Sequence, residues 1–475
     1  MPGSGCRHRA QVSVGCEPVV TILDIYLEAV QEPVGQLSAE PDGDVSFRYV
    51  TDAIPHAISA SLPIRAEPFG DVAARGFFSN LLFENEMRDQ VMQRHGIAER
   101  DIVGLLAHLG ADCPGAISCV PEGAPPGKRP GRLDIDYEML DGAPVVPEAA
   151  PATGLDIVPL PVEGTLARLM ASLRDHRRLP AVIDDPSPLA GVQGKVALAV
   201  LPNGRLGLPK PGSGAPTTHI LKVPRESAMS SVVREHLATR LMARVQRHPV
   251  AQTRVMGEGS LQGLLITRFD RNVAEGKVHR LHQEDLCQAL GLGHTLKYER
   301  RGVEGRAFNA SAICEILRST RVPALARQAF FEITLTNMVL GNFDNHAKNH
   351  ALLYAAARPD LAPAYDIGPV LLDAGVIHEM SFRIGKARMA DDVDRDDLSA
   401  FITALGARGF SKAQENRVIG IAQALVQATE DLPRLAGKGL CDAVRQQARH
   451  LSENLELGLD IPEFDAVPVN RPERM

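Results

Sequence analysis

The polar residues most able to do chemistry lie in one run from Gly341 to Asn349, which reads Gly-Asn-Phe-Asp-Asn-His-Ala-Lys-Asn. It follows an apolar stretch with helical spacing, and Gly341 is a typical helix-ending residue. Asp344 and Asn349 have the spacing Asp-x-x-x-x-Asn of a kinase catalytic loop, in which the Asp accepts a hydroxyl proton and the Asn binds magnesium. A polar turn that caps the helix has the same composition. The run therefore predicts either phosphoryl transfer or a plain helix cap.

A second acidic motif, Tyr365-Asp366-Ile-Gly368, follows a predicted strand at residues 351–356. Asp-Ile-Gly stands where kinases have Asp-Phe-Gly, whose carboxylate binds magnesium. A bare carboxylate would repel the phosphates of ATP, and a divalent cation held by Asn349 and Asp366 would reverse that repulsion. Alone, the motif is equally typical of an Asp-capped turn.

A lysine inside an apolar strand is the third feature. Lys222 lies in Ile-Leu-Lys-Val, and burial of its charge requires an anionic partner. In kinases such a strand lysine contacts the α- and β-phosphates of ATP, and Glu235 on the following predicted helix could pair with it. The alternative is a lysine whose ammonium reaches water.

Two further segments have the composition of nucleotide contacts. The run from Ser187 to Lys195, Ser-Pro-Leu-Ala-Gly-Val-Gln-Gly-Lys, precedes an apolar strand and could present backbone N–H groups to phosphates, or form a simple hairpin turn. The strand that ends at Thr267-Arg268-Phe269 could be a hinge that offers backbone groups to adenine, or a strand end with surface charges.

Composition limits the possible functions. The chain has 475 residues, 44 % hydrophobic and 23 % charged, as in ordinary globular proteins. A net charge of −7 and the absence of Trp argue against a polycation that coats nucleic acid and against a base-stacking platform. The seven cysteines lack zinc spacing, no apolar stretch approaches the ~20 residues that span a bilayer, and no secretory signal is recognisable. We expect reduced thiols, no membrane and a cytoplasmic location.

The motifs must be positioned by segments of different character. We expect a compact N-terminal module over residues 1–120, a Pro- and Gly-rich linker over 121–165, a lobe of strands and helices over 166–275, a mostly helical lobe over 276–460 and a loose tail over 461–475.

Within the N-terminal module the pattern predicts five elements. Two strands flank the Gly- and Asp-rich turn at residues 41–44, and a third strand is expected over 57–63. A helical stripe extends over 78–95, and Asp101 caps a further helix that stops at Gly110.

Taken in order, these motifs resemble those of the HipA-like serine/threonine kinases, the toxin half of a bacterial toxin–antitoxin pair. The likeness covers nearly the whole chain. It is carried by Gly110-Ala-Asp-Cys-Pro-Gly-Ala, Ala190-Gly-Val-Gln, Pro216-Thr-Thr-His-Ile-Leu-Lys222, Arg268-Phe-Asp-Arg271, the run from His282 to Gly291, Lys297-Tyr298-Glu299, Asp344-x-His-x-Lys-Asn349 and Ala364-Tyr365-Asp366. The resemblance implies an α+β, two-lobed protein-kinase-like fold with an added N-terminal α/β subdomain and a mostly helical C-terminal lobe.

The same resemblance implies roles for individual residues. Asp344 would be the catalytic base, Asn349 and Asp366 would hold Mg²⁺, and Lys222 would contact ATP with Glu235 as its partner. The other ATP-binding residues would be Ala190, Gly191, Val192, Gln193, Gly194, Lys195, Thr267, Arg268, Phe269, His346, Lys348 and Tyr365. His346 and Lys348 would lie near the transferred phosphoryl group, where Lys348 could offset developing charge.

Three departures from the family pattern are visible. Pro188 stands where family members often have a regulatory serine, so Ser187, one residue earlier, is the candidate phosphorylation site. Thr267 replaces an acidic hinge residue, and Arg234 replaces a frequent Asn before the helix glutamate. The base and metal residues are unaffected.

The resemblance also implies partners: a HipB-like helix-turn-helix antitoxin, operator DNA reached mainly through that antitoxin, and a protein substrate. In this family the substrate can be an aminoacyl-tRNA synthetase such as glutamate–tRNA ligase. The alternatives are a lipid or small-molecule kinase, since Asp-x-His-x-x-Asn also resembles lipid-kinase loops, and a catalytically weak corepressor that acts with the DNA-binding partner. A metal hydrolase built on Asp344, His346 and Asp366 has too few clustered ligands.

Overall fold

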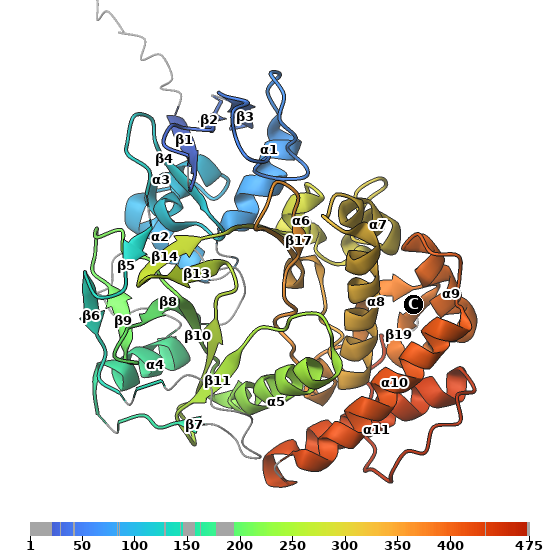
Figure 1. The fold of residues 1–475 in the computed structure, drawn as a ribbon. Helices are drawn as coiled ribbons and strands as arrows, with labels where there is room; N and C mark the ends of the chain where they lie inside the picture. The colour runs from blue at the N-terminus through green and yellow to red at the C-terminus, as the bar shows by residue number, and fades with distance from the viewer. Residues whose placement is uncertain are drawn as a thin grey trace, which may run out of the picture.

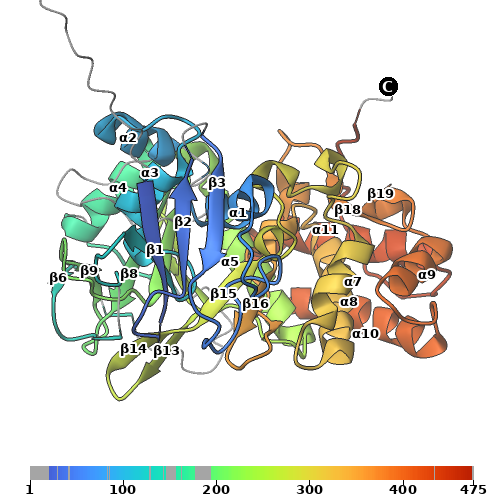
Figure 2. The same ribbon diagram turned by 90° about the horizontal axis from the view of Figure 1, so that it is seen from above.

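The computed structural model places the chain in three parts: an N-terminal subdomain, a sheet-rich lobe and a helical lobe (Figure 1). It describes residues 21–28, 30–40, 43–82, 84, 86–127, 130–142, 144–145, 157–161, 163–176, 194–432 and 434–472. In Figure 2 the strand-rich blue and green parts lie on one side and the orange and red helices on the other. The fold class is the predicted one, α+β with two lobes and an added subdomain.

The N-terminal subdomain is a four-stranded antiparallel sheet, in the order β3-β2-β1-β4, packed with helices. Its elements are β1 (Thr21–Leu27), β2 (Gly35–Ala39), β3 (Val45–Tyr49), α1 (Asp71–Phe78), α2 (Glu86–His95), α3 (Ile102–Leu109) and β4 (Ile117–Pro121). Alternate residues of β3 are buried in one core with the apolar sides of α1 and α3. As predicted, Asp101 caps α3 by accepting a hydrogen bond from the Gly104 N–H.

Two predictions for this subdomain were wrong. Residues 57–63 form turns with an isolated bridge between Ser59 and Leu62, because their polar groups bind another part of the chain instead of a neighbouring strand. The Ser59 hydroxyl and the Ala60 N–H donate to Glu284 at 2.5 and 3.0 Å. The helix expected over 78–95 is interrupted, since α1 ends at Phe78 and α2 begins at residue 86.

The sheet-rich lobe is a seven-stranded sheet in the order β6-β9-β8-β10-β12-β11-β7. Its strands are β6 (Tyr137–Met139), β7 (Ile157–Val158), β8 (Gly194–Val200), β9 (Leu206–Pro209), β10 (His219–Val223), β11 (Thr253–Met256) and β12 (Gly263–Thr267). The helices α4 (Thr165–His176) and α5 (Ser230–Val245) pack against it. The predicted strand with Lys222 is β10, in the middle of the sheet.

Short strands connect this lobe to the rest of the molecule. They are β5 (Gly131–Arg132), β13 (Arg271–Ala274), β14 (Lys277–Arg280), β15 (His282–Asp285), β16 (Ala351–Tyr354) and β17 (Asp360–Leu361). A buried ion pair and a hydrogen bond join β14 and its surroundings to the N-terminal subdomain: Arg280 contacts Glu28 at 2.5 Å, and Asp270 accepts a hydrogen bond from the Gly115 N–H.

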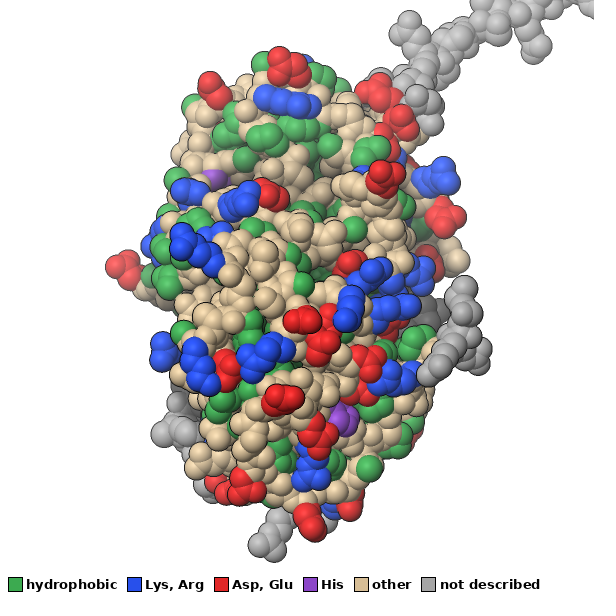
Figure 3. All heavy atoms as spheres, turned by 90° about the vertical axis from the view of Figure 1, so that its right-hand side faces the viewer, with side chains coloured by type: hydrophobic (Ala, Val, Ile, Leu, Met, Phe, Trp, Pro, Cys, Tyr) green, Lys and Arg blue, Asp and Glu red, His purple; other side chains and the backbone are tan. Residues whose placement is uncertain are grey.

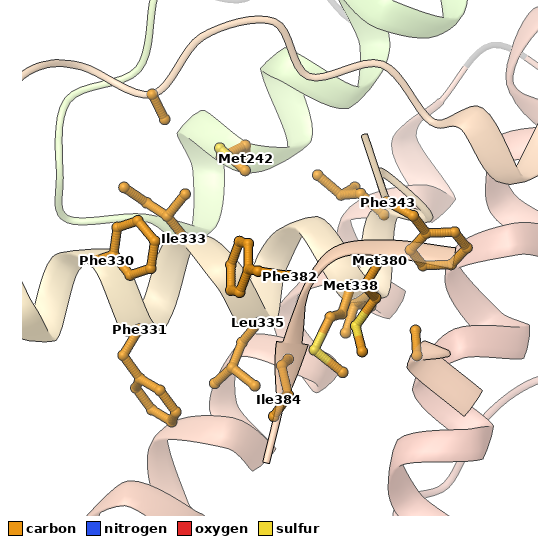
Figure 4. Close-up of a cluster of buried hydrophobic side chains, with 14 of the residues drawn as sticks. Met242, Phe330, Phe331, Ile333, Leu335, Met338, Phe343, Met380, Phe382 and Ile384 are labelled. Carbon is orange, nitrogen blue, oxygen red and sulfur yellow. The ribbon is translucent and has the colours of Figure 1, made fainter. Parts of the chain in front are cut away.

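The helical lobe is organised around α8 (Pro323–Leu340). Its other elements are α6 (Leu286–Ala289), α7 (Ala310–Arg318), β18 (Glu379–Ile384), β19 (Ala387–Met389), α9 (Arg395–Ala404), α10 (Lys412–Ala428) and α11 (Arg434–Asn454). Figure 4 shows Phe330 and Ile333 of α8 near Met242 of α5 and Phe382 of β18. This close-packed core makes α8 a rigid support for the loop that begins at Gly341.

The tail that we expected to be loose is held against the helical lobe over residues 461–472. Asn470 donates to the carbonyls of Ala374 and Val376, and its N–H donates to His378. Arg471 binds Asp391 and Asp392.

Figure 3, which faces this side of the molecule, shows basic and acidic side chains interspersed, unlike the continuous basic stripe of many DNA-binding surfaces.

Candidate active site

The loop from Asn342 to Asn349 begins where α8 ends. Gly341 closes the helix, as predicted, in the left-handed conformation with φ of 73°. A Cβ on this residue would lie 2.8 Å from the Cβ of Leu371. Glycine is therefore favoured both by the backbone angle and by the lack of space.

Hydrogen bonds from the loop to its own backbone fix its shape. The carbonyl oxygen of Asp344 accepts from the His346 N–H at 3.0 Å and from Nδ2 of Asn349 at 2.8 Å. This bond fixes the orientation of the Asn349 amide, whose oxygen Oδ1 is its one acceptor atom and so the atom able to ligate a cation. Burial raises the pKa of the Asp344 carboxyl, and burial lowers the pKa of His346 to about 3, so this imidazole is neutral at physiological pH.

Lys222 joins the two lobes through an ion-pair triad in which Lys222 and Glu235 are buried and Asp366 is half-buried. Its Nζ lies 2.7 Å from Glu235 Oε2 on α5 and 2.8 Å from Asp366 Oδ1 in the helical lobe. Burial opposes the charge of Lys222, but Asp366 and Glu235 together raise its pKa above the ordinary value. Burial also opposes the charge of Asp366, and the lysines Lys222 and Lys195 lower its pKa well below the usual range. Asp366 is thus an anion at neutral pH.

Two features of the backbone bring these charges together. In the antiparallel pairing of β8 with β10, Lys195 lies directly opposite Lys222. Asp366 has a φ of 58°, which is unusual for a residue other than glycine and is held here by the surrounding structure. Sparsely populated backbone angles of this kind are frequent at functional sites.

One cavity of about 410 Å³ collects most of the predicted site residues. Those that line it are Lys195, Lys222, Glu235, Thr267, Arg268, Phe269, Asp344, His346, Lys348, Asn349, Tyr365 and Asp366. They come from both lobes and are separated by up to about 170 positions in the chain. Gly194, the first residue of β8, is not among the lining residues, and Ser187 and Ala190 to Gln193 lie outside the described residues.

Some of these side chains are engaged away from the cavity. The guanidinium of Arg268 binds Asp270 with two hydrogen bonds, at 3.0 and 2.8 Å, and also binds Thr217. The Tyr365 hydroxyl donates to the Lys348 carbonyl at 2.7 Å, and its ring lies 5.4 Å from that of Phe269. Phe269 and Tyr365 thus give the cavity an aromatic edge.

The ammonium of Lys348 is bound by other protein groups. It contacts Asp285 at 3.0 Å, Glu84 at 3.3 Å and Asn80 Oδ1 at 2.9 Å. Although burial opposes its charge, these carboxylates raise the pKa of Lys348. Its charge is therefore compensated by these carboxylates, and the contacts join the loop to Asp285 and to the N-terminal subdomain.

Sequence reasoning missed two residues of the N-terminal subdomain, Asn80 and Glu84, which line the same cavity. Glu84 bridges Lys297 at 3.0 Å and Lys348, and its pKa is lowered to about 2 because these lysines outweigh the effect of burial. Neither residue lies in a motif with a chemical spacing, so no local signal could have indicated them.

A sheet-rich lobe and a helical lobe that share a Lys–Glu–Asp triad and an Asp-x-x-x-x-Asn loop define a protein-kinase-like phosphotransferase.

Comparisons with known proteins identify the family. The model for the HipA-like C-terminal domain matches residues 187–432, and that for the HipA N-terminal domain matches residues 23–120. A protein of Sinorhizobium fredii named "Putative kinase Y4mE" is 33 % identical over 87 % of this chain and 93 % of its own length. The serine/threonine-protein kinase toxin HipA of Shewanella oneidensis is 28 % identical over 70 % of this chain and 71 % of its own length.

The fold has a counterpart among solved structures. The complex of HipA, HipB and operator DNA from Shewanella oneidensis contains a chain that matches with a TM-score of 0.70 and 22 % identity, over 92 % of this chain and 98 % of that one. The chain belongs to the HipA family.

Proposed function

We propose that this protein is a Mg-ATP-dependent serine/threonine protein kinase. The observation that carries the proposal is the contact of Lys222 with both Glu235 and Asp366, in the cavity that Asp344 and Asn349 also line. In protein kinases a Lys–Glu ion pair holds the lysine on the phosphates, and a neighbouring Asp and Asn bind the metal.

The residues present fit a magnesium ion shared with ATP. The described part of the chain contains no group of three or more His, Cys, Asp or Glu side chains that could hold a metal alone. A carboxylate oxygen of Asp366 and Oδ1 of Asn349 are the hard oxygen ligands that Mg²⁺ prefers, and in kinase sites phosphates and water complete its shell. When bound, the ion would neutralise charge on the phosphates.

The chain's own residues then have defined tasks. Lys222 and Lys195 hold phosphate oxygens, which suits a buried and a half-buried lysine that lie opposite each other in a strand pair. Asp344 accepts the proton of a serine or threonine hydroxyl while that oxygen bonds to the γ-phosphorus. The bond from the γ-phosphorus to the bridging oxygen breaks, and ADP leaves. Thr267, Arg268 and Phe269 offer backbone groups and a ring to adenine.

The relatives support a biological context for this activity. We infer that the protein is the toxin of a toxin–antitoxin pair, that a HipB-like helix-turn-helix antitoxin binds it, and that operator DNA is reached mainly through that partner. We propose a cytoplasmic protein substrate, with an aminoacyl-tRNA synthetase such as glutamate–tRNA ligase as the first candidate. No helix among the described residues could cross a bilayer.

The proposal is tested by phosphate transfer from labelled ATP to proteins of a cell lysate. Asp344→Asn should abolish labelling while ATP still binds, and the nearby Asn345→Ala should serve as a matched loop control. Label on serine or threonine of a protein supports the proposal. Equal labelling by wild type and Asp344→Asn, or label found only in lipids or small molecules, overturns it.

A further inference from the structure

Tyr298 touches the predicted catalytic base, although no role for it follows from the spacing of the motifs. Its hydroxyl donates a hydrogen bond to Oδ1 of Asp344 at 2.8 Å. Tyr298 is half-buried and lines the cavity described above. It belongs to Lys297-Tyr298-Glu299, a motif that the ATP and metal sites leave unexplained.

The tyrosine ring is held from several sides. The guanidinium of Arg300 lies over the ring, 4.1 Å from its centroid, and the His346 ring packs edge-on at 5.2 Å. An aromatic ring between a cation and a second ring has few alternative positions. The phenol is therefore fixed with respect to the loop that carries Asp344.

The residues on both sides of Tyr298 are also anchored. The Lys297 carbonyl accepts from the Ala347 N–H at 3.1 Å, which ties this segment directly to the loop, and the Lys297 ammonium binds Glu84. The Glu299 carboxylate accepts from the Arg383 N–H at 2.6 Å. These fixed neighbours favour a Tyr298 side chain that stays in place when a substrate binds.

We propose that Tyr298 is a positioning residue for phosphoryl transfer: its hydroxyl fixes the orientation of the Asp344 carboxylate so that the remaining acceptor positions face the substrate hydroxyl. This inference rests on the proposed function. A carboxylate has two oxygens and about four lone-pair sites, so one bond from Tyr298 leaves room for the substrate. A base that rotates freely spends less time in the reactive geometry, and small errors in placement are costly.

The test is Tyr298→Phe, which removes only the hydroxyl and keeps the ring between Arg300 and His346. The matched control is Tyr137→Phe, because the Tyr137 hydroxyl also makes one hydrogen bond, to the Pro216 carbonyl at 2.6 Å, in the other lobe. Steady-state transfer from labelled ATP to the protein substrate found in the lysate experiment is measured with purified full-length variants. The KM for ATP and the melting temperature of each variant are measured as well.

We expect kcat of Tyr298→Phe to fall roughly 10-fold or more, with the KM for ATP within about twofold of wild type, and Tyr137→Phe to behave like wild type. If Tyr298→Phe also has a lower melting temperature than wild type, Arg300→Ala is the second variant to measure. It frees the ring without removing the hydroxyl and should lower kcat by a smaller factor. An unchanged kcat of Tyr298→Phe overturns the inference, and so does an unchanged kcat of Arg300→Ala where Tyr298→Phe melts earlier. A faster Tyr298→Phe also overturns it, since the phenol would then compete with the substrate.

Asp344→Asn, measured in the same assay, separates the two proposals. If Asp344→Asn is as active as wild type, the proposed function fails. If Asp344→Asn is inactive and Tyr298→Phe is not impaired, only the role of Tyr298 fails.

Discussion

Lys222→Met separates the structural from the catalytic contribution of the ion-pair triad. Methionine has a similar volume but no charge, so Glu235 and Asp366 lose their shared partner, at 2.7 and 2.8 Å respectively. The Glu235 side chain is only 8 % exposed, so its unpaired charge is poorly screened, whereas the Asp366 side chain is 35 % exposed and is partly screened by water. Removing one partner of a buried ion pair costs about 3–5 kcal/mol, and we expect about 3 kcal/mol here.

The companion variant is Lys222→Met with Glu235→Gln, which removes the buried charge that the first change leaves unpaired. We expect the double variant to regain most of the lost free energy of unfolding and none of the transfer activity, because no ammonium remains for the phosphates. Urea unfolding at pH 7 measures the first quantity and transfer from labelled ATP the second. A loss below about 1 kcal/mol in Lys222→Met would show that the triad is solvated. An active double variant would refute the assignment of Lys222 to ATP.

Three further predictions concern other parts of the molecule. Burial raises the pKa of Glu284 to about 7, so the folded protein binds more protons than the unfolded chain between pH 4.5 and 7. The free energy of unfolding should therefore fall by about 3 kcal/mol as pH rises through this window. In urea unfolding, Glu284→Gln should flatten this dependence of the unfolding free energy on pH. Gly341→Ala should destabilise by more than ~1 kcal/mol because of its φ and the nearby Leu371, whereas Gly420→Ala, in a helix with open space, should be neutral or stabilising. Asn349→Ala should raise the Mg²⁺ concentration for half-maximal transfer roughly 10-fold or more, and an unchanged Mg²⁺ titration would contradict its role as a ligand.

Local patterns were sufficient for much of the fold. The apolar strand around Lys222, the helix that ends at Gly341 and the Asp101-capped helix all depend on hydrophobic periodicity and on capping residues, which act within a few positions of the chain. Local patterns failed at residues 57–63, where the alternation of apolar and polar residues predicted a strand. The polar groups there are satisfied by Glu284, more than 200 positions away, and no local pattern contains that contact.

The sequence by itself determined which residues could carry phosphoryl transfer, because the types and spacing of Asp344, Asn349 and Asp366 are set by the chemistry of phosphate, metal and proton. Tertiary structure alone decided which other groups complete the site. It placed the Tyr298 hydroxyl on the Asp344 carboxylate, and it surrounded Lys348 with carboxylates and an amide from two parts of the chain. Electrostatic and hydrogen-bonding partners depend on distances in space, and folding brings together residues whose separation in the sequence carries no information about those distances.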